Sequence, residues 1–172
     1  MKKEFEFKCA CCGEIHKGIP TYGAKLPLAA FYIPKEERSK RVDAGDSDCV
    51  IDEKYFFLRG CIEIPVKGFD DVFIWGAWVS LRKEDFIEYV SCSEDSDRTA
   101  LGPYYGYLSG HFLPYEEDCE DLRVILHPRE NGTRPYLELE KTNHLLSIEQ
   151  HGGISARRVA EIFEIMEHRN NA

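Results

Sequence analysis

The segments that decide the fold are YFFLRGCIEIPV at residues 55–66 and VFIWGAWVSL at residues 72–81. In the first segment apolar side chains occupy the even-numbered positions, whereas the odd-numbered positions include Arg59 and Glu63. Because successive side chains of a strand point to opposite faces, this alternation indicates a half-buried strand, with a break at Gly60. The second segment is apolar on both faces, which is typical of a central strand that is covered on both sides.

Further strands are expected around these two segments. Residues 104–108 form one candidate, and residues 122–127 and 136–140 form a second hairpin. The connection of that hairpin contains Asn131-Gly132, a dipeptide that accepts the backbone angles of a tight turn.

Helices are expected at residues 36–42, after a cap at Ser80, and at residues 155–168, where apolar side chains recur at helical spacing. Hairpins outnumber the alternating strand and helix patterns of a parallel sheet. The expected fold class is therefore α+β, with a curved, mostly antiparallel sheet, a few packed helices and an N-terminal cysteine knuckle.

The composition favours one soluble domain over residues 1–172, with the knuckle at residues 1–20 and the sheet-and-helix core at residues 21–172. The chain has 43% hydrophobic residues, enough for a sizeable core, and a formal charge of -9, which disfavours non-specific binding to nucleic acid or to anionic membranes. No apolar export segment follows Met1-Lys2-Lys3, and no run of about 18 apolar residues occurs. We therefore expect a cytoplasmic protein that binds neither nucleic acid nor membranes.

The strongest chemical signal is Cys9-x-x-Cys12-Gly13, in which two thiolates can bind one metal ion from a single turn. In a cytosolic protein, clustered cysteines favour metal ligation or redox chemistry over a disulfide framework. A structural zinc site needs two more ligands, for which His16, Cys11, Cys49 and Cys61 are the candidates. The preferred set is Cys9, Cys12, His16 and Cys49.

Three other interpretations of the cysteines remain open. A thioredoxin-like site places the cysteine pair at the start of a helix, which does not suit the hairpin-like context of Gly13. The cysteines can also be reduced thiols beside a buried turn. A nucleophile built from Cys49 and one of the histidines has no local sequence signature.

A candidate binding surface combines an aromatic residue of the central strand with the tyrosines of the next one. Tyrosine joins apolar area to a polar tip and is enriched at interfaces. The residues of this predicted surface are Trp78, Tyr104, Tyr105 and Tyr107.

Taken together, the motifs resemble the bacterial family catalogued as domain of unknown function 2199. The resemblance covers nearly the whole chain and rests on Cys9-x-x-Cys12-Gly13-x-x-His16-x-Gly18, Cys49-Val50-Ile51-Asp52, Phe56-Phe57-x-Arg59-Gly60, Glu63-Ile64-Pro65, Trp75-Gly76-x-Trp78-Val79-Ser80-Leu81, Pro103-Tyr104-x-Gly106, Arg134-Pro135, Glu138-Leu139-Glu140, Glu149-Gln150 and Gly153-Ile154. None of these motifs is a catalytic signature. The resemblance implies a domain with no assigned reaction and is compatible with the preferred metal set.

The leading hypothesis is a non-enzymatic binding module with a structural zinc site and a protein partner. A small metal-dependent enzyme is the first alternative, in which the ion keeps an open position and Asp52 acts as a base. The second alternative is an inhibitor or immunity-type protein that acts through its acidic surface.

Overall fold

The structure is a computed structural model, which describes residues 4–93, 96–130 and 132–168. Its centre is the hairpin of β6 (Tyr55–Pro65) and β7 (Val72–Leu81), paired in register from Phe56↔Leu81 to Pro65↔Val72. Both predicted strands are confirmed. The expected break at Gly60 is wrong, because β6 runs through it without interruption.

Three more strands close this hairpin into a ring. β8 (Tyr104–Leu108), β9 (Arg123–His127) and β10 (Tyr136–Leu139) follow β7 as an antiparallel series, and β10 then pairs with β6 in parallel at Tyr136↔Cys61. The α+β fold class is confirmed, but the sheet is a closed five-stranded barrel rather than an open curved sheet. Gly60 permits the closure, since a Cβ there would lie 2.7 Å from the backbone oxygen of Pro135.

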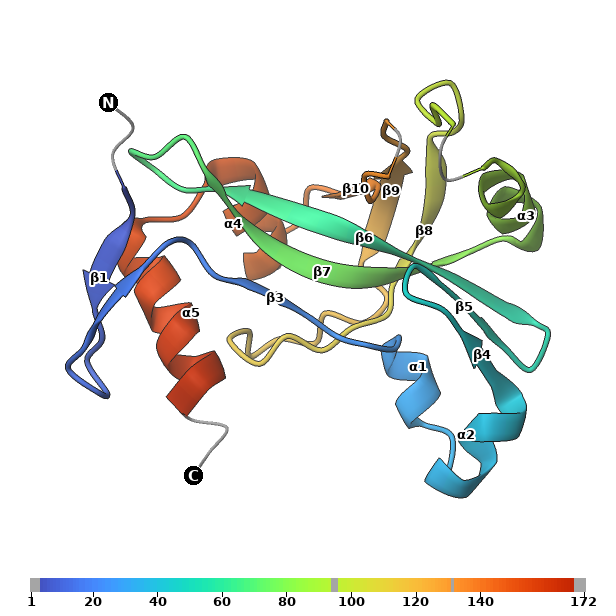
Figure 1. Cartoon of the computed structure of the whole chain (residues 1–172), viewed down its shortest axis with the longest axis horizontal. Helices are drawn as coiled ribbons and strands as arrows, with labels where there is room; N and C mark the ends of the chain where they lie inside the picture. The colour runs from blue at the N-terminus through green and yellow to red at the C-terminus, as the bar shows by residue number, and fades with distance from the viewer. Residues whose placement is uncertain (1–3, 94–95, 131, 169–172) are drawn as a thin grey trace.

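Short strands extend the barrel at two edges (Figure 1). β3 (Thr21–Gly23) lies parallel to β7, and β5 (Asp48–Ile51) and β4 (Val42–Ala44) continue the sheet beyond β6. The hairpin of β1 (Glu6–Lys8) and β2 (Ile15–Lys17) forms a separate two-stranded sheet.

The two faces of β7 belong to different apolar clusters. Trp75 packs in the main cluster inside the barrel, whereas Trp78 packs outside it with residues of α1 (Leu28–Phe31) and β5. Both indoles are 1% exposed. The prediction that β7 is covered on both sides is confirmed.

The helices pack around this framework. α2 (Lys35–Arg41) and α5 (Ala156–His168) match the predicted segments, and α3 (Lys83–Ser91) follows β7 with Arg82 rather than Ser80 at its N-cap position. Ser80 is still part of β7. No helix in the described part of the chain is long and apolar enough to cross a membrane.

Two features of the C-terminal half differ from the expectations. α4 (Leu145–Gly152) was not predicted. β9 and β10 form the expected hairpin, but they are joined by a longer connection than a tight turn, and Asn131 lies outside the described residues.

Candidate metal centre

The β1–β2 hairpin forms the cysteine knuckle. Cys9 follows β1 directly, and the turn is closed by hydrogen bonds from Gly13 N–H to Cys9 O at 3.0 Å and from Cys9 N–H to Glu14 O at 2.9 Å. Gly13 has a φ of 74°, which side chains with a Cβ rarely adopt. The glycine of the motif therefore permits the tight turn that carries Cys9 and Cys12.

Two histidines reach this turn from different elements. His16 belongs to β2, and its Nε2 lies 3.3 Å from Cys12 Sγ. His168 is the last residue of α5, and its Nε2 lies 3.4 Å from Cys9 Sγ. The ring of Phe163, also on α5, lies 4.4 Å from the ring of His16 and 5.9 Å from that of His168, measured between centroids.

The four side chains converge on one point. The ligand atoms of Cys9, Cys12, His16 and His168 all lie within 4.8 Å of one another. Zinc bonds of about 2.3 Å to sulfur and about 2.0 Å to nitrogen, arranged tetrahedrally, place sulfur and nitrogen about 3.5 Å apart. The two sulfur–nitrogen distances above are close to that value, so the arrangement can hold a tetrahedral ion.

The surroundings of Cys9 in the knuckle lower the pKa of its thiol. Burial opposes ionisation of this thiol, but backbone N–H groups of Cys12 and Cys11 point at its sulfur, and together they lower the pKa of Cys9. Thiolate is the form of cysteine that binds metals. Two thiolates and two neutral imidazoles would balance the charge of a divalent ion.

Helix α5 contacts the β1–β2 hairpin at two places besides His168. The backbone N–H of Ala10 donates to Glu164 Oε1 at 2.6 Å, and the ring of Phe7 packs against Phe163 at 5.2 Å. β1 accordingly lies alongside α5, at the end of the molecule opposite α1 and α2 (Figure 1). These contacts bring the end of α5, and with it His168, next to the knuckle.

The structure brings three residues of the preferred set together, and the fourth member of this cluster is His168 rather than Cys49. Cys49 is fully buried in β5, in the apolar cluster of Ile51 and Trp78, and burial raises its pKa to about 11. β5 and β1 lie at opposite ends of the molecule (Figure 1). His168 is 159 positions from Cys9, so no local spacing could have revealed it; its one sequence signal is a histidine that ends an amphipathic helix.

A cysteine and a histidine also lie close together away from the knuckle. Cys119 Sγ lies 3.7 Å from His144 Nε2, but burial raises the pKa of Cys119 to about 12. His144 Nδ1 accepts a hydrogen bond from Leu146 N–H, which leaves the proton of a neutral ring on Nε2. This pair lacks both the thiolate and the free base that nucleophilic catalysis requires.

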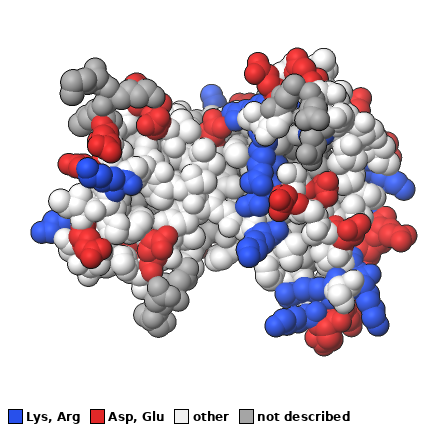
Figure 2. All heavy atoms as spheres, viewed as in Figure 1, with Lys and Arg blue, Asp and Glu red and all other residues white. Residues whose placement is uncertain are grey.

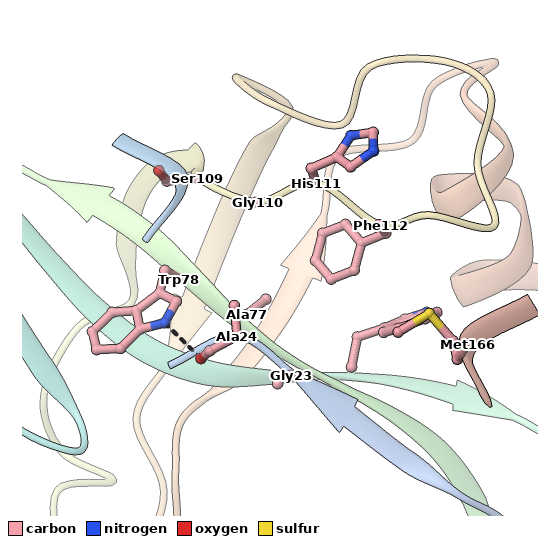
Figure 3. Close-up of a pocket in the computed structure, with 11 residues that line it drawn as sticks. Gly23, Ala24, Ala77, Trp78, Ser109, Gly110, His111, Phe112 and Met166 are labelled. Atoms are coloured by element: carbon pink, nitrogen blue, oxygen red, sulfur yellow. Dashed lines mark hydrogen bonds between the residues drawn. The ribbon is translucent and has the colours of Figure 1, made fainter. Parts of the chain in front are cut away.

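Two of the four residues of the predicted binding surface are buried, and the other two are exposed. Trp78 and Tyr104 are 1% and 3% exposed, so neither can form part of a surface. Trp78 Nε1 donates to Ala24 O at 3.1 Å, beside an apolar pocket of about 180 Å³ between β3, β7 and Met166 (Figure 3). Tyr105 and Tyr107 are 65% and 48% exposed and line an open groove of about 660 Å³.

The comparisons with known proteins identify a family but no characterised relative. A family described as an uncharacterized protein conserved in bacteria (DUF2199) matches residues 8–154. The match includes Cys9, Cys12 and His16 and ends before α5, which supplies His168. Among curated proteins and among solved structures, none is significantly similar to the chain. The chain belongs to the DUF2199 family.

Proposed function

We propose that this chain is a non-enzymatic binding module whose structural zinc ion joins the N-terminal hairpin to helix α5. The observation that carries the proposal is the convergence of Cys9, Cys12, His16 and His168 within 4.8 Å. Thiolate and imidazole are the ligands of structural zinc sites, in which four protein groups complete a tetrahedron.

The ligand count favours a structural ion over a catalytic one. A catalytic zinc keeps one position for water or substrate, whereas four protein ligands leave none. Asp52, the base of the enzyme hypothesis, is held by Arg41 through two hydrogen bonds of 2.7 Å. Asp52 follows β5 directly, so it lies at the end of the molecule away from the knuckle (Figure 1).

An ion at this point would stabilise a part of the fold whose two strands contain no buried residue. A two-stranded hairpin is marginally stable alone, and both strands of this one have an exposed, half-buried, exposed pattern. Ligation by His168 would tie the hairpin to a helix at the other end of the chain. Metal binding would then contribute directly to folding free energy.

The groove at Tyr105 and Tyr107 is the surface on which we place a protein partner. Two exposed tyrosines lie there beside Val124 and Ile125, and Arg82 also lines the groove. Aromatic and arginine side chains are enriched at protein interfaces, where they supply most of the binding energy. This mode of binding does not require the acidic surface on which the inhibitor hypothesis depends.

Elemental analysis of the protein purified without added metal tests the zinc site. We expect about one zinc ion per chain, its loss in Cys12→Ser and His168→Asn, and a lower free energy of unfolding in the presence of a chelator. An ion present at about 100 times its dissociation constant would add about 2.7 kcal/mol to that free energy.

Two matched controls keep the test specific. Cys11→Ser changes the neighbouring exposed thiol, which is not one of the four ligands, and Cys49→Ser changes the residue that sequence alone favoured. Both variants should retain zinc, although Cys49→Ser should be less stable because it buries a hydroxyl among apolar side chains. Metal-free protein whose stability does not respond to a chelator, or zinc retained by His168→Asn, would refute the site.

A further inference from the structure

A second polar site lies where β6 changes its partner strand. Arg59 N–H donates to Ser47 O at 2.8 Å, ahead of β5, whereas Cys61 N–H donates to Pro135 O at 2.9 Å, ahead of β10. Residues on both sides of this change line a pocket of about 80 Å³. Three of its lining residues are arginines, Arg59, Arg98 and Arg134.

These arginines lack the carboxylate partners that other arginines of the chain have. Arg129 and Arg158 form ion pairs of 2.6 Å with glutamates, and Arg41 pairs with Asp52 at 2.7 Å. Within residues 4–93, 96–130 and 132–168, none of the three pocket arginines forms an ion pair. Arg98 and Arg59 lie over aromatic rings instead, 4.4 Å from the Tyr89 centroid and 6.0 Å from that of Trp78, so no described carboxylate neutralises their charge.

Two of the pocket arginines also have N–H groups that donate to no described residue. Among the described residues, the buried Nε atoms of Arg59 and Arg98 have no hydrogen-bond partner, whereas Nη2 of Arg98 donates to Cys92 O at 2.5 Å. The Arg59 side chain lies over Gly23 and Gly76, where no Cβ obstructs its Nη2. Its guanidinium donates no hydrogen bond to a described residue, and its one described contact with a side chain is with the Trp78 ring, 6.0 Å from the centroid.

Burial and a neighbouring positive charge both act on Arg59. Burial lowers the pKa of Arg59 from its ordinary value, and the positive charge of Arg134 lowers it further; Asp46 opposes this shift but forms no ion pair with Arg59. Buried donors are normally hydrogen-bonded in native proteins, and a cluster of guanidinium groups without carboxylate partners suits an anionic ligand. Figure 2 shows a column of Lys and Arg side chains across the middle of this face, over β6 and β7.

We propose that the pocket lined by Arg59, Arg98 and Arg134 binds a phosphate group, either as inorganic phosphate or as the monoester of a small molecule. Guanidinium forks match phosphate oxygens, and several of them offset its double negative charge. The hydroxyls of Ser47 and Thr133 line the same pocket and can donate to further oxygens. A volume of about 80 Å³ admits one such group but no larger ligand body, which would remain outside.

Calorimetric titration with inorganic phosphate, and separately with glycerol phosphate, tests this site. We expect saturable binding and an increase in melting temperature for at least one of them. Arg134→Gln should weaken the binding at least about tenfold, because a charge-assisted hydrogen bond is lost. The site is separate from the metal centre, so zinc content should not change.

The stability of Arg134→Gln without phosphate separates a ligand-binding role of Arg134 from a structural one, because a structural role would lower the melting temperature. In the absence of phosphate, Arg134→Gln should melt at the same temperature as the parent protein or higher, since it relieves repulsion at Arg59. Arg129→Gln is the matched control, because this residue is on the same connection but already paired with Glu63. Arg59→Lys should keep the charge yet lose affinity, because ammonium has no fork.

The titrations also separate the two sources of the phosphate group. Preference for glycerol phosphate would identify a monoester as the ligand, and preference for inorganic phosphate would identify the free ion. Absence of saturable binding to either probe, or equal weakening by Arg129→Gln and Arg134→Gln, would overturn the proposal.

Discussion

Replacing Glu149 with glutamine should strongly destabilise the fold, because its carboxylate is the centre of a buried polar network. Glu149 is 7% exposed, and its Oε1 accepts from Arg158 Nε at 2.6 Å while its Oε2 accepts from the Tyr115 hydroxyl at 2.6 Å. Burial and the adjacent carboxylate raise the pKa of Tyr115, so its hydroxyl stays protonated and donates. The network links α4, α5 and Trp75 of the barrel, whose Nε1 donates to the Tyr115 oxygen at 3.3 Å.

The magnitude follows from what Glu149→Gln removes. Each hydrogen bond to a charged acceptor is worth about 1.5–3 kcal/mol, and removing one partner of a buried ion pair costs about 3–5 kcal/mol. The Arg158 side chain is 19% exposed and lies 3.8 Å from Glu161, which partly offsets the lost charge. We therefore expect a loss of about 3 kcal/mol in the free energy of unfolding.

Urea unfolding followed by tryptophan fluorescence at fixed zinc concentration measures this loss as a lower midpoint with an unchanged slope. Arg157→Gln is the control, because its side chain is 89% exposed and its ion pair with Glu161 should contribute little. The double variant Glu149→Leu with Arg158→Met should be more stable than either single variant, since it removes both charges together. A loss below about 1 kcal/mol for Glu149→Gln, or no coupling in the double-mutant cycle, would refute the network's role.

Two further substitutions test the barrel closure and the β5–β6 turn. Gly60→Ala should cost about 1–3 kcal/mol in the same assay, because its Cβ would lie 2.7 Å from both Pro135 O and Leu137 Cγ, whereas Gly152→Ala, with nothing within 4 Å, should be neutral or stabilising. Equal stability of the two variants would contradict the close approach of β10 to β6. A hydrogen bond from Arg41 lowers the pKa of Asp52, so this carboxylate should stabilise the fold above its unfolded-state pKa of about 3.9, and that stabilisation should be lost as the pH falls through the lower folded-state value. Asp52→Asn should therefore flatten the acid limb of the stability curve; an unchanged limb would show that Arg41 and Asp52 do not interact in solution.

The long strands could be predicted because their signal is local. Alternation along β6 and continuous apolarity along β7 depend only on neighbouring side chains and on burial. Closure of the barrel could not be predicted in this way. It depends on a parallel pairing between Tyr136 and Cys61, which are far apart in the sequence, and on the missing Cβ of Gly60.

Helix α4 was missed because its polar residues point inward. Glu149 takes part in the buried network, and the side chain of Gln150 accepts from Leu139 N–H at 2.8 Å and donates to Leu137 O at 2.7 Å. Gln150 thus supplies hydrogen bonds to backbone groups of β10 on the side of that strand that does not face β9. Polar residues with such roles obscure the apolar periodicity by which a helix is predicted.

The candidate metal site likewise combines residues that local sequence can reveal with one that it cannot. Cys9, Cys12 and His16 lie in one hairpin, so their spacing alone indicates that they can share an ion. The fourth position depends on how α5 docks, and Cys49 was a poor substitute because a buried cysteine in an apolar cluster acts as a small hydrophobic residue.

Helix α5 has two sets of contacts with the rest of the protein, and they explain why a metal ion would stabilise the N-terminal hairpin and the end of α5 but not the barrel. The helix is held near its start by Arg158 and Glu149, and near its end by Glu164 and His168 at the knuckle. Only the second set of contacts would include the ion, and the hairpin it fastens buries far less apolar surface than the barrel. Local stability follows local burial, so removal of the metal should release the hairpin and the last turns of α5 while the Arg158 contact and the five-stranded barrel remain folded.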